Sequence, residues 1–405
     1  MSIIFNLPVI VVSLGYFVDI FDLTLFNMVR RQSLIDIGIP ESELVSKGLI
    51  LLNAQMLGML VGGIVWGQLG DRRGRLSTLF ASIIMYSLAN LANAFVYDFV
   101  TYLVLRFVAG IGLAGELGVG ITLVSEILPQ ERRGLGTTMV ATIGVLGAVM
   151  GGLFVEIFDW RTCYIIGGVM GLLLLVLRVR VHESPMFQSA HKQSGLKKGN
   201  FLLFFRTFDL FKRLNLCILV GVPIWFVAGI LMPFTPELAK ELGVTEPILA
   251  SRSIAISYLG LAVGDFLSGV TSQLLKSRKK ALILFQIVTL LLVIALFYSV
   301  TNQGQLYFYG LCFLIGVGAG FWALFVTIAA ENFGTNLRAT AATSIPNFVR
   351  ASVFPMTLML NGFQMFLSYT QATLSVGVIV FLIAIWAATQ IKETFALSLD
   401  YYEHV

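Results

Sequence analysis

Charged residues are scarce in this sequence. Lys, Arg, Asp and Glu make up 12% of the 405 residues, hydrophobic residues make up 57%, and the mean hydropathy is +0.89. Soluble domains contain about 25% charged and roughly 45–50% apolar residues. The composition therefore excludes an ordinary soluble domain and predicts an integral membrane protein. In such a protein the net charge of +5 does not indicate a nucleic-acid partner, because the location of the basic residues carries more information than their total.

Metal-binding and nucleotide-binding patterns are missing from the apolar stretches. The three histidines fall in a polar loop or in the C-terminal tail, and are His182, His191 and His404. The three cysteines have no metal-like spacing and are interpreted as small hydrophobic residues. The sequence also lacks a GxxxxGK[ST] loop, which ATP-driven proteins use to bind phosphates. We therefore expect no metal, no cofactor and no enzymatic activity.

Long apolar stretches recur along the whole chain, separated by polar segments. A helix needs about 20 apolar residues to cross a hydrocarbon core of roughly 30 Å. The stretches of about that length predict an all-α membrane protein with twelve transmembrane helices, at residues 4–29, 47–69, 76–96, 99–128, 135–158, 162–179, 214–234, 253–275, 281–300, 306–330, 339–362 and 366–390.

The basic residues lie mostly on one side of the predicted membrane. Nineteen of the 27 fall on the side that carries both predicted termini, and six fall on the other side. Arg178 is counted among the nineteen and Arg30 among the six. Because cytoplasmic loops are enriched in Lys and Arg, we expect both termini to face the cytoplasm, at a bacterial inner membrane.

The longest polar connection divides the helices six and six. It predicts an N-terminal half at 1–180, a connecting loop at 181–213 and a C-terminal half at 214–405. A shift of 205 residues places GQLGDRRGR (67–75) over SQLLKSRKK (272–280), and places Glu126 and Arg133 over Glu331 and Arg338. Parallel repeats of this kind are typical of transporters whose substrate site lies between the halves near the membrane midplane.

The short loop between the second and third helices combines glycines with charges. The glycines allow a tight turn, and the carboxylate of Asp71 can accept from arginines or cap a helix. Charges at matching helix ends in both halves predict a cytoplasmic gate that forms in one conformation and separates in another, although topology charges and helix caps explain the arginines equally well. The predicted gate consists of Gly67, Gly70, Asp71, Arg72, Gly74, Arg75, Glu126, Arg133, Glu331 and Arg338.

These motifs resemble those of the major facilitator superfamily. GQLGDRRGR is similar to its signature loop, and RFVAGIG (106–112), EILPQERRG (126–134), ESPMF (183–187) and KETF (392–395) lie where sugar-porter-like members carry related motifs. GYFVDIFDLTLF (15–26) is similar to the first helix of the metabolite:proton symporter branch, with Asp19 in the place of a glutamate. The resemblance implies a proton-coupled transporter of two six-helix halves. Lys276 replaces Asp71 in the second repeat, so its latch is expected to be weaker or differently built.

Six charged residues lie inside predicted helices. A charge at the bilayer centre costs roughly 2.5–3.5 kcal/mol on insertion scales, so each is a functional candidate. They are Asp19, Asp22, Arg106, Glu116, Asp265 and Arg350.

Asp22 and Arg106 are predicted to lie at matching depths. With a rise of about 1.5 Å per residue, they are roughly 10 and 12 Å from the outer edge of their helices. We expect an ion pair that opens when Asp22 accepts a proton, and a permanent structural bridge is the alternative. Asp19 lies about 60° round the same helix, and the sequence does not decide which of the two acids carries the proton. Glu116 is a second candidate proton site, with a structural hydrogen-bonded role as the alternative.

Arg350 is the candidate substrate-binding residue of the second half. A permanent cation near the midplane, between helix breaks expected at Pro346 and Pro355, can hold an anionic group through two parallel hydrogen bonds. The alternative is that Arg350 pairs with Asp265 or another acid. The other residues expected to contact substrate are Asn347, Asp265, Trp225, Tyr258 and Trp322, although packing explains the aromatic residues equally well.

The sequence therefore predicts a monomeric secondary transporter that imports a small anionic or zwitterionic metabolite together with protons. An efflux antiporter for a drug or siderophore-like compound is the alternative within transport, but VLGAVMGG in the fifth helix lacks the proline of the antiporter signature. A receptor that senses substrate on a transporter scaffold is the alternative outside transport.

Overall fold

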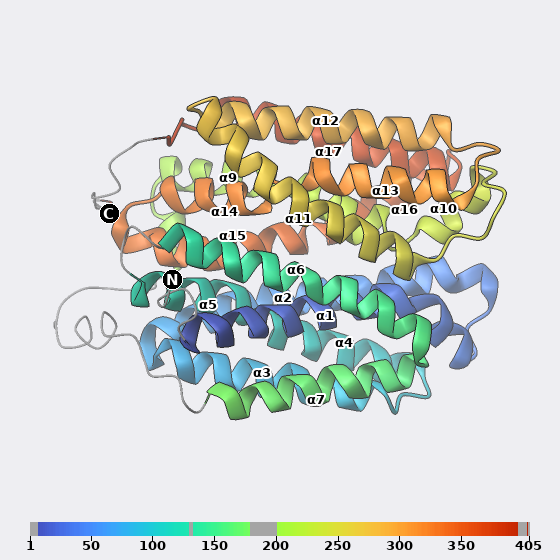
Figure 1. Cartoon of the computed structure of the whole chain (residues 1–405), viewed down its shortest axis with the longest axis horizontal. Helices are drawn as coiled ribbons and strands as arrows, with labels where there is room; N and C mark the ends of the chain where they lie inside the picture. The colour runs from blue at the N-terminus through green and yellow to red at the C-terminus, as the bar shows by residue number, and fades with distance from the viewer. Residues whose placement is uncertain (1–6, 129–132, 179–200, 396–402, 404–405) are drawn as a thin grey trace.

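The computed structural model describes residues 7–128, 133–178, 201–395 and 403. In these ranges the chain is helical, with no strand (Figure 1). The first half contains α1 (Leu7–Asp36), η1 (Glu41–Glu43), α2 (Leu44–Arg73), α3 (Arg75–Asn93), α4 (Phe99–Leu113), α5 (Glu116–Ile127), α6 (Arg133–Ile157) and α7 (Trp160–Arg178). The second half contains η3 (Phe201–Phe205), α9 (Phe208–Phe226), η4 (Val227–Leu231), α10 (Thr235–Glu241), α11 (Ala250–Leu274), α12 (Arg278–Ser299), α13 (Gln305–Ala319), α14 (Trp322–Glu331), α15 (Thr335–Ala351), α16 (Val353–Phe363) and α17 (Tyr369–Gln390).

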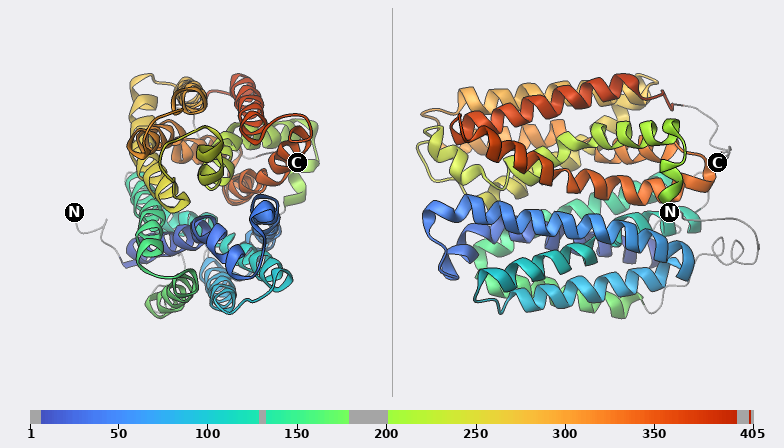
Figure 2. Two further views of the ribbon diagram at one scale, coloured as in Figure 1. Left: turned by 90° about the vertical axis from the view of Figure 1, so that its right-hand side faces the viewer. Right: turned by 180° about the vertical axis from the view of Figure 1, so that it is seen from behind.

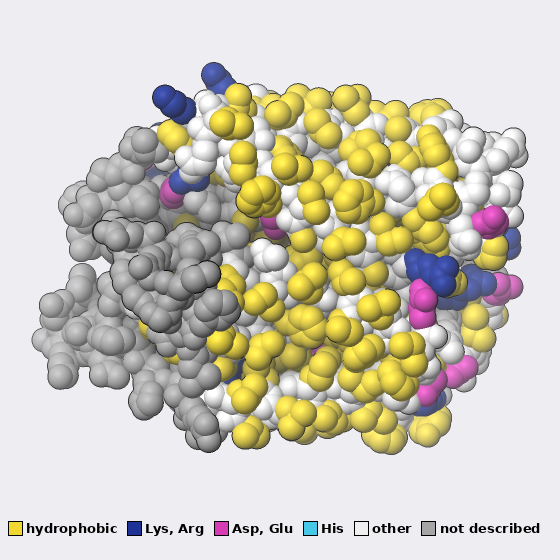
Figure 3. Space-filling model, viewed as in Figure 1, with side chains coloured by type: hydrophobic (Ala, Val, Ile, Leu, Met, Phe, Trp, Pro, Cys, Tyr) yellow, Lys and Arg dark blue, Asp and Glu magenta, His cyan; other side chains and the backbone are white. Residues whose placement is uncertain are grey.

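Twelve membrane crossings follow from these helices, as the sequence predicts. In the described ranges ten segments are long and apolar enough to span a membrane, and three of them join consecutive elements, namely η1 with α2, α9 with η4 and α13 with α14. The two remaining crossings are α4 with α5 and α15 with α16, in which a break divides the helix. Figure 3 shows the result on one face, with hydrophobic side chains across the middle and most charged side chains towards the two ends.

The helix breaks occur at equivalent positions of the two halves. α4 ends at Leu113 and α13 at Ala319, and the following helices begin at Glu116 and Trp322, so both pairs are 206 positions apart. Glycine explains the close packing beside each break: a Cβ on Gly110 would lie closer than 3.0 Å to the backbone of α2, and one on Gly316 would do so to the backbone of α11. Gly110 and Gly316 are also 206 positions apart.

A proline explains the break between α15 and α16. Pro355 has no backbone N–H, so it cannot donate to the carbonyl of Ala351, the residue at which α15 ends. Pro346, by contrast, lies inside α15 without ending the helix.

The two halves lie side by side along the long axis of the molecule. Seen along that axis, the helices of the first half (blue to green) form one group and those of the second half (yellow to red) form another (Figure 2, left). The groups meet where α6 packs against α11 and α2 packs against α15. We call the end at which α1 begins and α17 ends the terminal end, and the opposite end the far end (Figures 1 and 2).

Loops at the far end fix the starts of the helices that follow them. Asp98 accepts from the backbone N–H of Thr101 at 2.9 Å and so caps α4. This hydrogen bond lowers the pKa of the exposed Asp98 carboxyl. Ser368 and Gln371 form a capping box at the start of α17.

Candidate substrate and proton site

A small cavity lies between the two halves. Its volume of about 30 Å³ is enough for a single water molecule. It is enclosed by residues from α1 and α6 of the first half and from α9, η4, α11, α14 and α15 of the second half. These are Tyr16, Ile20, Val145, Ile224, Trp225, Ala228, Tyr258, Leu261, Trp322 and Arg350.

Four of the predicted substrate residues, Trp225, Tyr258, Trp322 and Arg350, therefore line one cavity. Tyr16 joins them from the first half and was missed by sequence reasoning. The available signal was its position three residues before Asp19, on nearly the same face of α1.

Arg350 is buried, with a side chain that is 1% exposed. Its guanidinium carbon lies 5.7 Å from the ring centre of Trp225 and 5.8 Å from that of Trp322, which are cation–π distances. Nη1 donates to the side-chain oxygen of Asn347 at 3.4 Å, and Nη2 lies 4.0 Å from a carboxylate oxygen of Asp19. A cation in the cavity thus has a distant acidic partner from the opposite half and aromatic faces on two sides.

Asp19 and Asp22 are fully buried on α1. Among the described residues no side chain donates a well-formed hydrogen bond to either carboxylate, although the amide of Asn90 lies near enough to Asp22 to interact with it. Asp19 faces Arg350, whereas Asp22 interacts electrostatically with Arg106 and with Asp19. The two acids thus have different cationic neighbours. Because buried ionised carboxylates are costly unless they are paired and hydrogen-bonded, this arrangement suits acids that exchange protons.

The direct ion pair predicted between Asp22 and Arg106 is not formed in this structure. Arg106 donates from Nη1 to the hydroxyl of Tyr164 at 2.8 Å, and its guanidinium carbon lies 5.4 Å from the ring centres of Phe26 and Tyr164. An open pair is one of the two states that the prediction describes, so the coupling role of the two residues stays a prediction. In this structure the guanidinium of Arg106 has a phenol oxygen from α7 as its hydrogen-bond partner.

Glu116 forms a buried ion pair with Arg178, in which both side chains are 1% exposed. This pair corrects the assignment of Arg178, which the sequence analysis counted among the cytoplasmic loop cations. Arg178 is the last residue of α7, and its side chain points back into the bundle towards the start of α5. Gly15 of α1 leaves the space that the pair fills, since a Cβ there would lie closer than 3.0 Å to both charged groups.

Asp265 and Asn347 contact the helix breaks. Asp265 accepts from the backbone N–H of Ala323 at 3.0 Å, where α14 begins, so it caps that helix and does not pair with Arg350. Asn347 donates at 3.1 Å to the carbonyl of Ala114, in the break between α4 and α5. This second contact joins the two halves directly.

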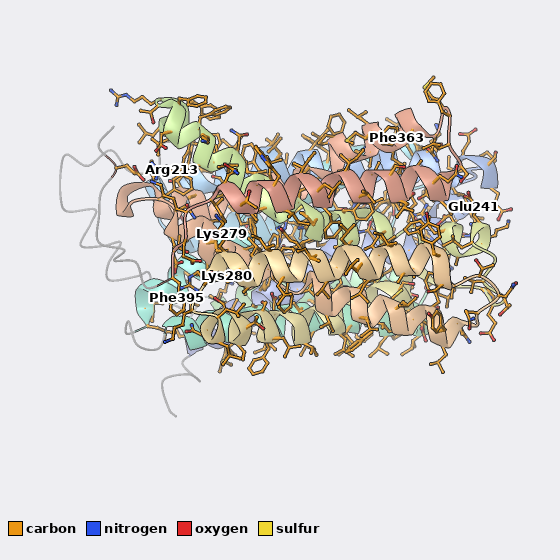
Figure 4. All side chains as sticks on the ribbon, turned by 90° about the horizontal axis from the view of Figure 1, so that it is seen from above. Arg213, Glu241, Lys279, Lys280, Phe363 and Phe395 are labelled. Atoms are coloured by element: carbon orange, nitrogen blue, oxygen red, sulfur yellow. The ribbon has the colours of Figure 1, made fainter. Side chains whose placement is uncertain are left out.

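The second latch at the terminal end is described by the contacts of Arg278, Glu331 and Glu393. Arg278 and Glu331 form an ion pair with distances of 2.6 and 2.7 Å, while Glu393 accepts from the backbone N–H groups of Arg278 and Lys279 at the start of α12. In Figure 4, Arg213, Lys279, Lys280 and Phe395 gather at this end and Glu241 lies at the other.

Other residues of the predicted gate are described only in part. Gly74 has a φ of 102° and forms the turn between α2 and α3, which favours glycine, and Gly67 lies in α2 near Thr343 of the second half. Gly70 is described only as part of α2. The described part of the structure leaves out the side chains of Asp71, Arg72, Arg75, Glu126, Arg133 and Arg338.

Comparison with known proteins supports this architecture. The family model described as Major Facilitator Superfamily matches residues 12–354. A putative metabolite transport protein of Haemophilus influenzae is 27% identical over 354 residues, which are 84% of each chain. The niacin transporter NiaP of Acinetobacter baylyi is 32% identical over 181 residues, 43% of this chain and 40% of the relative.

Among solved structures, the inward open conformation of the xylose transporter XylE from E. coli has a TM-score of 0.72. The match covers 96% of this chain and 97% of that chain at 16% identity. At this identity the similarity supports the fold alone.

Proposed function

Because the chain belongs to the major facilitator superfamily and is a multi-pass membrane transport protein, we propose that it imports a small anionic metabolite together with a proton by alternating access. The observation that carries the proposal is the placement of Arg350 in the cavity between the halves, with Asp19 of the opposite half 4.0 Å away. Both halves thus contribute a charged group to one site.

The proposed substrate is an aromatic monocarboxylate. Arg350 offers a planar cation that suits a carboxylate, and Trp225 and Trp322 offer ring faces beside it. Niacin, which the NiaP relative is named for, belongs to this chemical class. The cavity of about 30 Å³ is too small for such a molecule, so binding requires the halves to separate first.

Proton coupling follows from competition for Arg350. When a substrate carboxylate binds the guanidinium, Asp19 loses its only cationic partner within 4.0 Å among the described residues. A buried carboxylate without a partner favours its neutral form, so Asp19 takes up a proton as the substrate anion binds. Proton and substrate therefore favour each other's binding, and this linkage is reciprocal.

The terminal end is proposed to face the cytoplasm. It carries the cationic stretch Lys276–Lys280, which leads into α12, and the residues Lys212 and Arg213 near the start of α9. This distribution fits the positive-inside rule. Under this orientation the far end faces outward and substrate enters from there. The boundaries of the two halves at 180 and 213, and a monomeric state, remain predictions.

Uptake by purified protein in liposomes tests the function. We expect an inside-alkaline pH gradient to drive accumulation of radiolabelled niacin or another aromatic carboxylate, well above the diffusion measured in protein-free liposomes. Arg350→Gln should raise the substrate concentration for half-maximal uptake by about 10- to 100-fold, since it removes a charge-assisted hydrogen bond of roughly 1.5–3 kcal/mol.

Arg252→Gln is the matched control, because Arg252 is a cation of the second half that is 43% exposed and remote from the cavity. It should leave uptake nearly unchanged. Outward movement of substrate driven by inward protons would support the antiporter, and saturable binding without flux would support the receptor. Either result contradicts the proposed uptake.

A further inference from the structure

Arg106 is held by a chain of buried hydroxyl groups that leads away from Asp22. Its Nη1 donates to the Tyr164 hydroxyl, which shares a 2.8 Å hydrogen bond with the Tyr102 hydroxyl. Tyr102 donates at 3.2 Å to Ser33, and Ser33 donates at 3.1 Å to the carbonyl of Arg30. Arg106, Tyr102 and Ser33 are fully buried, as is Tyr164. These buried hydroxyl groups therefore hold the guanidinium of Arg106 in the interior of the protein.

The donor order along this chain is determined by its two ends. A guanidinium only donates and a backbone carbonyl only accepts. Since Tyr102 donates its one proton to Ser33, Tyr164 must donate to Tyr102, and its oxygen is left to accept from Arg106. Each hydroxyl group of the chain is thus satisfied by its neighbours, and Arg106 supplies the first donor from Nη1.

Asp22 is left without such a partner. Both of its oxygens, and the Nε and Nη2 atoms of Arg106, make no hydrogen bond to the described residues. A buried carboxylate and a buried guanidinium with unused bonding atoms lie near each other without pairing. The phenol of Tyr164 is the one side-chain acceptor that the guanidinium of Arg106 bonds to among the described residues, through Nη1.

We propose that Tyr164 is a positioning residue that holds Arg106 away from Asp22, so that Asp22 keeps its proton in the conformation seen in this structure. Release of the Tyr164 hydrogen bond lets Arg106 pair with Asp22, and the carboxyl then gives up its proton. The inference rests on the proposed proton coupling and assigns the proton of this conformation to Asp22, because Asp19 has Arg350 as partner.

The titratable and polar groups near Asp22 come from four helices. Asp19 comes from α1, Tyr86 and Asn90 from α3, Arg106 from α4 and Tyr164 from α7. On the side of α6, the contact with α1 includes the uncharged rings of Phe21 and Phe154. Arg106 is the one cation among these groups, so a change in its distance from Asp22 changes how strongly the ionised carboxylate is favoured.

Infrared spectroscopy of the purified protein tests the proposal directly. The carboxylic-acid band of Asp22 is identified by its loss in Asp22→Asn, and its titration gives the pH at which the proton leaves. We expect Tyr164→Phe to move this midpoint to lower pH by about one unit or more, because an adjacent cation favours the ionised carboxylate. The double variant Tyr164→Phe with Arg106→Gln should restore the band, since no cation remains to pair.

Two controls separate positioning from a general loss of structure. Tyr86→Phe removes a hydroxyl that faces Asp22 but does not bond to Arg106, and Tyr102→Phe leaves the bond between Arg106 and Tyr164 intact. Both should leave the midpoint nearly unchanged. An unchanged midpoint in Tyr164→Phe, or a double variant that behaves like Tyr164→Phe, overturns the proposal. If wild-type protein shows no gradient-driven uptake, the proposed function fails instead.

Discussion

At the scale of single residues, the proposed proton coupling depends on the different roles of Asp19 and Asp22. The two acids are three positions apart on one helix, yet Asp19 faces a cation of the opposite half and Asp22 faces a cation of its own half. Only Asp19 can therefore respond to the substrate directly, because only its partner lines the cavity.

This division predicts the effect of Asp19→Asn. The amide resembles the protonated acid, so substrate affinity should become independent of pH, and exchange of labelled for unlabelled substrate should continue. Accumulation driven by a pH gradient should be lost. Binding by scintillation proximity at several pH values, together with exchange in liposomes, measures both effects. Affinity that still varies with pH as in the wild type is incompatible with competition for Arg350.

Several buried charges could not be assigned correctly from the sequence. Arg30 and Arg178 lie at the ends of apolar stretches, where a cation normally reaches solvent, so both were counted as loop residues. The structure buries both, because acids far away in sequence, Glu237 and Glu116, lie opposite them. Tyr164 was missed for a similar reason: tyrosine in an apolar helix gives no signal of the hydroxyl chain that its neighbours complete.

At the scale of elements, the twelve crossings could be predicted because hydropathy and length alone decide them. Pro355 predicts the break between α15 and α16, whereas Pro346, where a break is also expected, lies inside α15. The breaks between α4 and α5 and between α13 and α14 could not be predicted, since both crossings read as continuous apolar stretches. The repeat gave a partial signal, but the equivalence of these two breaks at 206 positions becomes visible only in the structure. The arrangement of the helices in two halves was predicted from the resemblance of the motifs to a known family, because hydrophobic periodicity does not specify how helices are arranged.

Gly15 of α1 leads to a stability prediction at this scale. Gly15→Ala places a Cβ against the Glu116–Arg178 pair, and disturbing a buried pair costs several kcal/mol. We expect the thermal unfolding midpoint in detergent to fall by about 5 °C or more. Gly269→Ala on α11 is the control, because a Cβ there meets nothing within 4 Å. It should be neutral or slightly stabilising, and an equal loss in both variants would argue against a structural role for the pair.

At the scale of the whole molecule, two ion pairs join the halves at the far end. Arg30 of α1 pairs with Glu237 of α10 at 2.7 Å, lies 4.0 Å from the ring centre of Phe234 and is 1% exposed. Arg252 of α11 pairs with Glu156 of α6 at 2.6 Å, but these side chains are 43% and 36% exposed. Under the proposed alternating access the far end has to open, so both pairs would break in each cycle.

The two pairs should differ in their effect on opening. Removing one partner of a buried pair is far more costly than removing one of an exposed pair. In protein carrying Ala228→Cys in the cavity, we expect Glu237→Gln to speed labelling by a bulky maleimide about tenfold or more, and Arg252→Gln to change it less than about twofold. Equal labelling rates in the two variants would exclude a special role for Arg30.

Proton uptake on substrate binding is the measurement that tests the central claim most directly. Calorimetric titration of the purified protein with an aromatic carboxylate, in buffers of different ionisation enthalpy, gives the number of protons taken up per substrate bound. If Asp19 takes up a proton as the substrate anion binds, we expect about one proton for the wild type and none for Asp19→Asn. Saturable binding by the wild type without proton uptake would contradict coupling through Asp19.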